Sequence, residues 1–305
     1  MKQPMKIAVL LTCHNRREKT CSCLRTLYSA LDCYNASHDG KVDIVTYLTD
    51  DGCSDGTTES VLQLLHGRRI HILQGNGALY WAGGMRFAWQ EAIKYHNEWD
   101  YYLLVNDDTD MMPNLFEELF FAQDYAVIHY GMQGIVSGIT CAKNDPKKLT
   151  YGGDIWVNKV LGTSRRLRPN DEPQLCDFTN ANILLVPIEI VDKIGVFYSG
   201  FSHGYADYDY AIMARKAGIP VLLTACFCGK CDDDHVDEEE VAQKLMSMSF
   251  KERKAYFNNP IHSNRDHLRF IIRTAPLRLP AVWIGRKMNL YWPRMYYLLN
   301  RIRKQ

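Results

Sequence analysis

Short apolar runs alternate with helix-like stretches along the first part of the chain, and this alternation constrains the fold more than any other feature. The apolar runs occupy residues 6–12, 42–48, 70–73 and 101–105. After the first run, apolar residues recur at intervals of three and four, which is the spacing of one helix face. They are Cys23, Leu24, Leu27, Ala30 and Leu31. Strands and helices that alternate in this way predict an α/β fold with a mainly parallel central sheet, covered by helices on both faces.

The second part of the chain is less regular. From about residue 134, short apolar runs (GIVSGI, ANILLVP and PVLLT) are separated by polar loops. A helix is predicted over residues 208–217, because Gly218 and Pro220 follow it. We interpret residues 1–260 as one domain with halves of about 1–130 and 131–260, followed by a basic, aromatic helical extension over residues 261–305.

Composition limits the class of protein. The 305 residues are 47% hydrophobic, which is enough to bury a sizeable core. No apolar run reaches about 18 residues, and the N-terminal segment lacks a small-residue cleavage site, so we expect a cytoplasmic protein. The ten cysteines are scattered along a large chain, which favours reduced thiols over a disulfide framework.

The charge is distributed unevenly. The net charge is +1, but residues 265–305 hold ten Lys or Arg and one Asp, which leaves −8 for residues 1–264. Residues 277–305 mix these cations with Trp and Tyr, a pattern that suits the anionic inner face of a cell membrane. The alternative is a helix packed on the domain or on another subunit of a homo-oligomer. Nucleic acid is not an expected partner, because the body is acidic and no known module is present.

Two predicted strands end in pairs of acidic residues: Asp50 with Asp51, and Asp107 with Asp108. Ligands of open α/β sheets bind at the carboxyl ends of strands. Carboxylates there suit Mg²⁺ or Mn²⁺ shared with substrate phosphates. The alternative for each pair is that acidic turn residues cap the following helix.

Two further segments carry candidate residues. The stretch GNGALYWAGGMR precedes a predicted helix, where exposed amides and Arg86 suit a phosphate, although it matches neither the dinucleotide nor the P-loop pattern. The string SGFSHGYADYDYAIMARKAGI sets Asp207 and Asp209 at the beginning of a helix. There they are either caps or, in the case of Asp207, a general base.

Together these segments resemble the family-two glycosyltransferases, which have the GT-A fold. The resemblance covers roughly residues 5–225 and rests on KIAVLLTCHNRRE, TDDGCSDGT, LLVNDDTD and GYADYDYAIMARKAG, in the family's order. The segment YWAGGMR is similar to the bacterial rhamnosyl- and galactosyltransferase subgroup of surface polysaccharide assembly. The resemblance implies inverting, metal-dependent transfer from a UDP-, dTDP- or GDP-linked sugar to a glycan or lipid-linked acceptor, with the nucleotide in the first half of the domain.

The resemblance also implies roles for particular residues. The donor site would include Thr12, His14, Asn15, Asp50, Asp51, Trp81, Gly83, Gly84, Arg86 and Asp107. Asp207 would be the catalytic base, with His203 and Asp209 at the acceptor. Asp108 and His235 would bind Mg²⁺ or Mn²⁺. The chain departs from the family pattern twice, with Asn106 in place of the first Asp of the DxD element and Ala206 in place of a Glu.

Three other functions stay open at this point. The two departures suit a sugar-nucleotide-binding protein without turnover. A sugar nucleotidyltransferase shares the sheet, but it needs a glycine-rich loop near the first strand, and CHNRREKT has no glycine. A zinc-dependent interaction module would use Cys226, Cys228, Cys231 and His235 as tetrahedral ligands.

Overall fold

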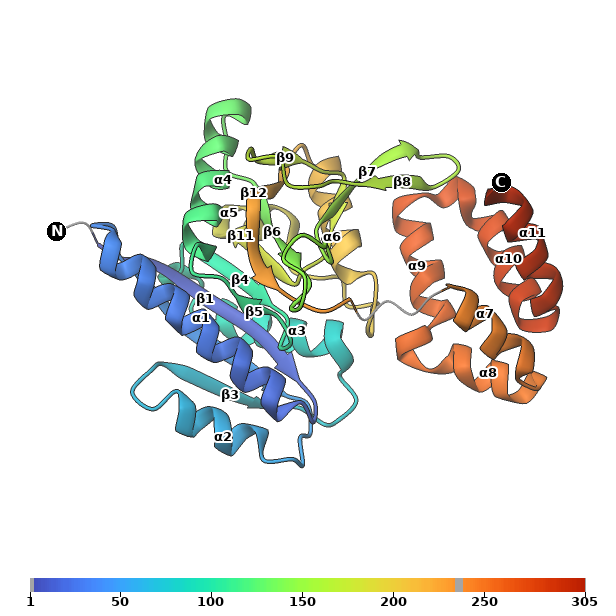
Figure 1. The fold of residues 1–305 in the computed structure, drawn as a ribbon, viewed down its shortest axis with the longest axis horizontal. Helices are drawn as coiled ribbons and strands as arrows, with labels where there is room; N and C mark the ends of the chain where they lie inside the picture. Colours follow the sequence, from blue (N-terminus) through green and yellow to red (C-terminus); the bar gives the residue numbers. More distant parts are fainter. Residues whose placement is uncertain (1–2, 234–237, 305) are drawn as a thin grey trace.

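The structure is a computed structural model, and it describes residues 3–233 and 238–304. A nine-stranded sheet forms its centre (Figure 1). The strands follow the order β3 (Ile70–Gln74), β2 (Val42–Asp50), β1 (Met5–Cys13), β4 (Tyr101–Val105), β11 (Ile183–Pro187), β6 (Ile135–Cys141), β12 (Val221–Lys230) and β5 (Asp110–Met111), and β9 (Gln174–Leu175) pairs with β12. The predicted α/β class is thereby confirmed.

The sheet is mixed, whereas the sequence predicted a mainly parallel one. β1 is parallel to β2 and β4, and β6 is parallel to β12, but β11 runs antiparallel between β4 and β6. The prediction missed this direction because a strand that is buried on both faces has the same continuous apolar pattern whichever way it runs. The short strands β5 and β9 also pair antiparallel to β12.

The reversed direction of β11 determines what meets at one edge of the sheet. Its amino end lies beside the carboxyl end of β4, since Ile183 pairs with Val105. The carboxyl ends of β1, β2, β6 and β12 lie at the same edge, because these strands run parallel to β4 or antiparallel to β11. We call this edge, with the loops that leave it, the carboxyl edge.

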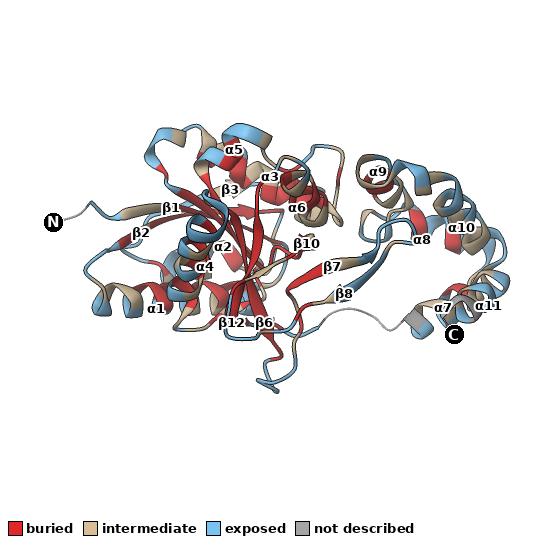
Figure 2. Ribbon diagram, turned by 90° about the horizontal axis from the view of Figure 1, so that it is seen from above, coloured by how far each residue is buried: buried red, intermediate tan, exposed pale blue. Residues whose placement is uncertain are grey.

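Helices cover both faces of the sheet, as the sequence predicted. α1 (Arg17–Ser37), α2 (Thr57–Leu64) and α4 (Leu115–Tyr130) pack on the face of β1 that carries Ile7, Val9 and Leu11. α3 (Tyr80–Ile93), α5 (Ile188–Ile194) and α6 (Ala206–Lys216) pack on the face that carries Ala8 and Leu10. Buried residues therefore fill the interior on both sides of the strands (Figure 2). A smaller sheet, β10 (Phe178–Thr179), β7 (Gly153–Asn158) and β8 (Thr163–Arg166), is antiparallel.

The helices that come after β12 gather at one end of the molecule (Figure 1). Its helices are α7 (Glu238–Ser247), α8 (Phe250–Asn258), α9 (Asn264–Thr274), α10 (Leu279–Tyr291) and α11 (Pro293–Lys304). α8 begins at a capping box formed by Ser249 and Glu252. The division predicted after residue 260 falls between α8 and α9, inside this helical group, and stays a prediction.

α9 joins the helical group to the rest of the protein. Phe270 and Ile271 are buried in the same core as α3 and α6. The Arg273 Nε atom lies 2.8 Å from Asp209 Oδ1 on α6. None of the helices within the two described ranges is both long and apolar enough to cross a membrane.

Candidate active site

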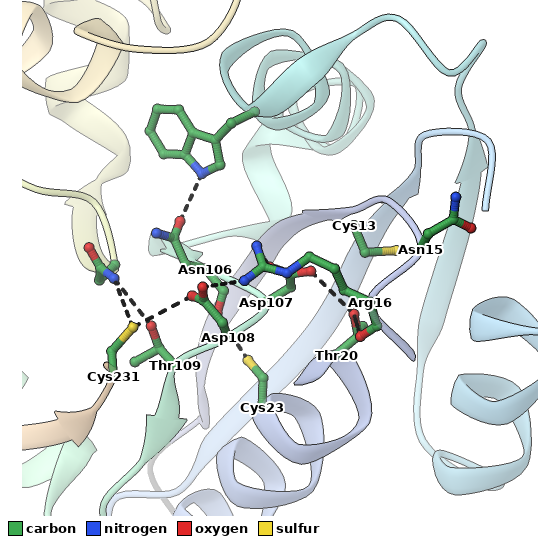
Figure 3. Close-up of polar contacts among 12 residues, drawn as sticks. Cys13, Asn15, Arg16, Thr20, Cys23, Asn106, Asp107, Asp108, Thr109 and Cys231 are labelled. Atoms are coloured by element: carbon green, nitrogen blue, oxygen red, sulfur yellow. Dashed lines mark hydrogen bonds and ion pairs between the residues drawn. The ribbon is translucent and has the colours of Figure 1, made fainter. Parts of the chain in front are cut away.

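Two adjacent carboxylates at the carboxyl edge share the guanidinium of Arg16 (Figure 3). Arg16 Nη1 lies 3.0 Å from Asp107 Oδ1, and Arg16 Nη2 bonds to Asp108 Oδ2. The pairing arises because β1 and β4 are neighbouring parallel strands, so the loops that leave them meet. Sequence reasoning missed Arg16. The sequence signal that could have identified Arg16 is a basic residue in the loop after β1, since β1 lies beside β4, the strand that the acidic pair follows.

The two carboxylates differ in their surroundings. Burial raises the pKa of Asp107 to about 7; the Arg16 guanidinium opposes this shift, and the charge of Asp108 adds to it. Thr20 Oγ1 also donates to Asp107, at 3.3 Å. Asp108 is more exposed, and the Cys231 thiol donates to its Oδ1 atom at 3.6 Å. Asp108 is therefore the more accessible carboxylate for a ligand.

Asn106, which directly precedes the acidic pair, links three parts of the fold. Its Oδ1 atom accepts a hydrogen bond of 2.7 Å from Trp81 Nε1, and its backbone amide donates to the Asn182 carbonyl at 3.0 Å. Trp81, an expected donor contact, is thus tied through its ring nitrogen to the segment that precedes the acidic pair. This contact couples the start of α3 to β4 and β11.

Asp50 holds together the loops that follow β1 and β2. It is buried; its Oδ1 atom accepts from the Cys53 amide at 2.7 Å, and its Oδ2 atom accepts from Thr58 Oγ1. Asn15 crosses to the same loop, where its Oδ1 atom accepts from the Ser54 amide at 2.7 Å. These contacts hold the turn after β2, and they place Asn15 beside Asp50 at the carboxyl edge.

Asp51 caps the amino end of α3. Its carboxylate accepts from the amides of Gly77, Leu79 and Tyr80, at 2.8, 2.9 and 3.0 Å. His14 Nδ1 donates to the Asp51 carbonyl at 2.6 Å. The sequence predicted that backbone amides before α3 are exposed to a phosphate. Three of them are instead hydrogen-bonded to the carboxylate of Asp51, which follows the neighbouring strand β2.

Gly84 allows α3 to pack directly against β1. A Cβ atom at this position would lie 2.1 Å from Thr12 Oγ1, far inside van der Waals contact. Thr12 is nearly buried, and its strand is held by neighbours on both sides. The two residues expected at the donor site therefore make a packing contact with each other.

Replacement of Gly84 by Ala is expected to lower the free energy of unfolding by about 1–3 kcal/mol, the usual result of overpacking a rigid contact. Chemical denaturation measures it. Gly40→Ala is the matched control, since Gly40 is exposed and a Cβ atom there would meet nothing within 4 Å. Equal stability of the two variants would contradict the close approach of α3 to β1.

Gly83 and Arg86 contact the loop that precedes α6. The Gly83 amide donates to the Ser202 carbonyl at 3.4 Å, and Arg86 Nη1 donates to the carbonyls of Phe201 and Tyr198 at 2.8 and 3.2 Å. Burial lowers the pKa of Arg86. Arg86 was expected to contact a phosphate. In this structure its side chain instead hydrogen-bonds to backbone carbonyls within residues 198–202.

Asp207 lies at the start of α6 and reaches the amino side of β11. Its Oδ1 atom accepts from the Tyr208 amide at 2.9 Å, and its Oδ2 atom accepts from the Ala181 amide at 3.2 Å. Burial raises its pKa to about 6, against the effect of these two hydrogen bonds. Ala181 is followed by Asn182, whose carbonyl accepts from the amide of Asn106, so segment 181–182 joins Asp207 to the acidic pair.

The two expected acceptor residues lie in different settings. The ring of His203 approaches that of Tyr80 at the start of α3, with centroids 6.4 Å apart, and burial lowers its pKa. Its Nδ1 atom is buried and has no hydrogen-bond partner within the described part of the chain. Asp209 is buried in the ion pair with Arg273 of α9, so its carboxylate is engaged in holding two helices together.

The three cysteines of the proposed zinc site have different neighbours. Cys226 Sγ donates to Asp171 at 3.7 Å, Cys228 is fully buried near Thr224 Oγ1, and Cys231 donates to Asp108. His235 lies outside the described residues. Among residues 3–233 and 238–304, no group of three or more His, Cys, Asp or Glu side chains is placed to hold a metal ion.

Backbone strain is concentrated in loops of the same region. Within the described ranges, four residues other than glycine have a positive φ, and three of them are Asn15 (51°), Tyr80 (55°) and Tyr205 (69°). Asn15 follows β1, Tyr80 begins α3, and Tyr205 precedes Asp207. Strained non-glycine residues of this kind cluster at functional sites, where the surrounding contacts hold them.

The carboxyl edge thus combines two kinds of acidic group. Asp107 and Asp108 form a pair that already binds a cationic group, the Arg16 guanidinium, whereas the separate carboxylate of Asp207 accepts from two backbone amides. Burial raises the pKa of both Asp107 and Asp207. The Asp107–Asp108 pair suits the binding of a cation that also contacts phosphate oxygens. Asp207 suits the transfer of a proton near neutral pH. A scan against protein-family models finds no match for the chain, and a comparison with curated proteins finds none either.

Proposed function

We propose that this protein is a GT-A-type glycosyltransferase that moves a sugar from a nucleoside-diphosphate donor to a glycan or lipid-linked acceptor, with inversion at the anomeric carbon. One observation carries the proposal: the pair of Asp107 and Asp108, of which Asp108 is the more exposed, and the separate carboxylate of Asp207 both lie at the carboxyl edge, joined through segment 181–182. A diphosphate-linked donor needs the carboxylate pair to hold a cation, and an acceptor hydroxyl needs the Asp207 carboxylate to take up its proton.

The acidic pair fits Mg²⁺ or Mn²⁺. The guanidinium of Arg16 shows that a positive charge is accommodated between Asp107 and Asp108. Both ions take hard oxygen ligands and commonly use one or two carboxylates together with substrate phosphates. When bound, such an ion neutralises charge on the departing diphosphate. Asp108 is the main protein ligand in this proposal because it is the less buried of the two.

Arg16 has a second use in the proposed site. A guanidinium pairs with phosphate oxygens as readily as with carboxylates, and often through two hydrogen bonds. Donor binding at the carboxyl edge would offer Arg16 an anionic partner in place of the acidic pair. We therefore assign Arg16, together with Asp108, to recognition of the diphosphate.

Asp207 performs the proton transfer in this proposal. Its carboxylate accepts the proton of the acceptor hydroxyl while that oxygen forms a bond to the anomeric carbon of the donor sugar. The bond from that carbon to the diphosphate oxygen breaks on the opposite face, and its electron pair leaves with the nucleoside diphosphate. Hydrogen bonds from the Ala181 and Tyr208 amides orient the carboxylate for this role.

Thermal unfolding with nucleotides tests the donor site without an acceptor. We expect UDP, dTDP or GDP with Mn²⁺ to raise the melting temperature, and EDTA to reverse the increase. A ligand at about 100 times its dissociation constant adds about 2.7 kcal/mol of stability. Adenosine diphosphate is the matched control for a diphosphate with the wrong base. The absence of stabilisation by all three nucleotides at millimolar concentration would count against the proposal.

A further inference from the structure

Exposed side chains of α8, of α10 and of Trp292, which directly follows α10, form a largely aromatic surface. We call it the α10 surface, and it consists of Phe250, Trp283, Ile284, Lys287, Tyr291 and Trp292. Trp283, Ile284, Tyr291 and Trp292 are each about half exposed, at 50, 52, 49 and 59%. No residue of α10, which is described throughout, is buried.

Ring contacts connect the members of this surface. The rings of Phe250 and Tyr291 stack with centroids 5.1 Å apart, and the rings of Tyr291 and Trp292 lie 5.8 Å apart. Lys287 Nζ lies over the ring of Trp283 at 5.5 Å. Lys287 and Tyr291 are four residues apart and therefore neighbours on one side of the helix.

The opposite side of α10 faces the protein. Arg286 Nε donates to His267 Nδ1 of α9 at 2.8 Å, and the Leu290 carbonyl accepts from Arg253 Nε of α8 at 2.7 Å. With 3.6 residues per turn, Ile284 and Tyr291 lie roughly a third to a half of a turn round the helix from Arg286. Leu279 and Val282 of α10 also pack against the core. The inward side of α10 therefore makes both polar and apolar contacts, and Ile284 and Tyr291 are left exposed on the other side.

Charge indicates what covers this surface. Residues 265–305 hold ten Lys or Arg and a single acidic residue, Asp266, which is buried and accepts hydrogen bonds from the Ser202 and His203 amides. Lys287 and Arg294 are exposed. A second copy of the chain docked on the same surface would bring like charges together, whereas anionic lipid head groups would neutralise them. Trp and Tyr are enriched where a membrane meets water.

We propose that the α10 surface docks on an anionic lipid bilayer. Trp283, Tyr291 and Trp292 enter the interfacial layer, and Lys287 contacts the head groups. Through α9, which binds α10 at His267 and α6 at Asp209, this surface is tied to the helix that carries Asp207. A docked protein would therefore hold its acceptor side at a fixed position relative to the lipid, a consequence that rests on the proposed function and points to a lipid-linked acceptor.

Sedimentation of the full-length protein with vesicles tests the docking. We expect binding to vesicles of equal parts phosphatidylglycerol and phosphatidylcholine, little binding to pure phosphatidylcholine, and weaker binding when salt rises from about 0.1 to about 1 M. The double variant Trp283→Ala/Trp292→Ala should lose at least about tenfold in affinity. The matched control, Val127→Ala/Ile128→Ala, also removes exposed apolar side chains, from α4, and should bind as the unsubstituted protein does.

Two results would overturn the proposal. One is vesicle binding that neither the tryptophan variant nor the lipid charge alters. The other is a concentration-dependent dimer that the tryptophan variant converts to a monomer, with no vesicle binding by either protein, which would identify a second copy as the partner. Vesicle binding requires neither donor nor acceptor, so its failure is distinguishable from failure of the proposed transferase function.

Discussion

Replacement of Asp207 by Asn is expected to lower the rate of glycosyl transfer roughly 10²–10⁴-fold, the usual contribution of a positioned general base. The amide has nearly the same shape as the carboxylate but takes up no proton from an acceptor hydroxyl. Initial rates at saturating donor measure the loss. Donor binding should change little, because the side chain contacts the Ala181 and Tyr208 amides rather than the acidic pair.

A matched control separates catalysis from stability. Asp177 also accepts a backbone hydrogen bond, from the Trp156 amide at 2.7 Å, beside the small antiparallel sheet. Asp177→Asn therefore removes one charge and perturbs one amide contact without touching the proposed base. Equal losses in the two variants would show that Asp207 acts only through the fold.

The raised pKa of Asp207 predicts the pH dependence of the same step. Burial raises this pKa to about 6, so the carboxylate is ionised at neutral pH and becomes protonated as the pH falls through about 6. The protonated group accepts no proton, and kcat should therefore decrease up to tenfold per pH unit below that value. A flat profile between about pH 5 and pH 8 would contradict the assignment of Asp207 as the base.

The second large effect is expected for Asp108→Asn. Loss of this carboxylate removes the most accessible ligand for the cation that neutralises the departing diphosphate, so kcat/KM should fall at least about 10²-fold. Stabilisation by the nucleoside diphosphate should also lose its dependence on Mn²⁺. Steady-state kinetics and thermal unfolding measure the two consequences separately.

Asp110→Asn is the control for the loss of negative charge in this segment. Asp110 lies two residues further along, where it pairs with Lys143 at 2.8 Å and accepts from Ser22 Oγ at 2.7 Å. Asp110→Asn changes the net charge by the same amount as Asp108→Asn, but it leaves the Asp107–Asp108 pair and its contact with Arg16 intact. Activity lost equally in both variants would assign the effect to general electrostatics instead of a bound cation.

Much of the fold followed from periodicity in the sequence. The strands at residues 6–12, 42–48 and 101–105 were predicted because continuous apolar runs that alternate with helices belong to a buried sheet, and β1, β2 and β4 contain them. The direction of β11 was not predicted, since ANILLVP carries no directional signal. The helices α7 and α8 were not predicted, and α8 has little apolar periodicity that could have indicated it.

The candidate site was predictable only in part. Acidic residues at strand ends could be located from the sequence, because strand ends at one edge of a sheet meet. Tertiary contacts determine which acidic side chains remain able to contact a ligand. The Asp51 carboxylate accepts hydrogen bonds from amides at the start of α3, and the Asp209 carboxylate pairs with Arg273. Arg16 was missed because its partners lie about ninety residues away in the chain, where local spacing gives no indication of the contact.

Product analysis tests the central claim most directly. The protein is incubated with Mn²⁺, with UDP-, dTDP- and GDP-linked sugars in turn, and with a panel of glycan and lipid-linked acceptors, and both the free nucleoside diphosphate and the new glycoside are measured. The proposal predicts that one donor class is consumed, that the product has the inverted anomeric configuration, and that Asp207→Asn slows product formation roughly 10²–10⁴-fold while nucleotide binding persists. Nucleotide binding without turnover, or a product whose formation is unaffected by Asp207→Asn, would contradict it.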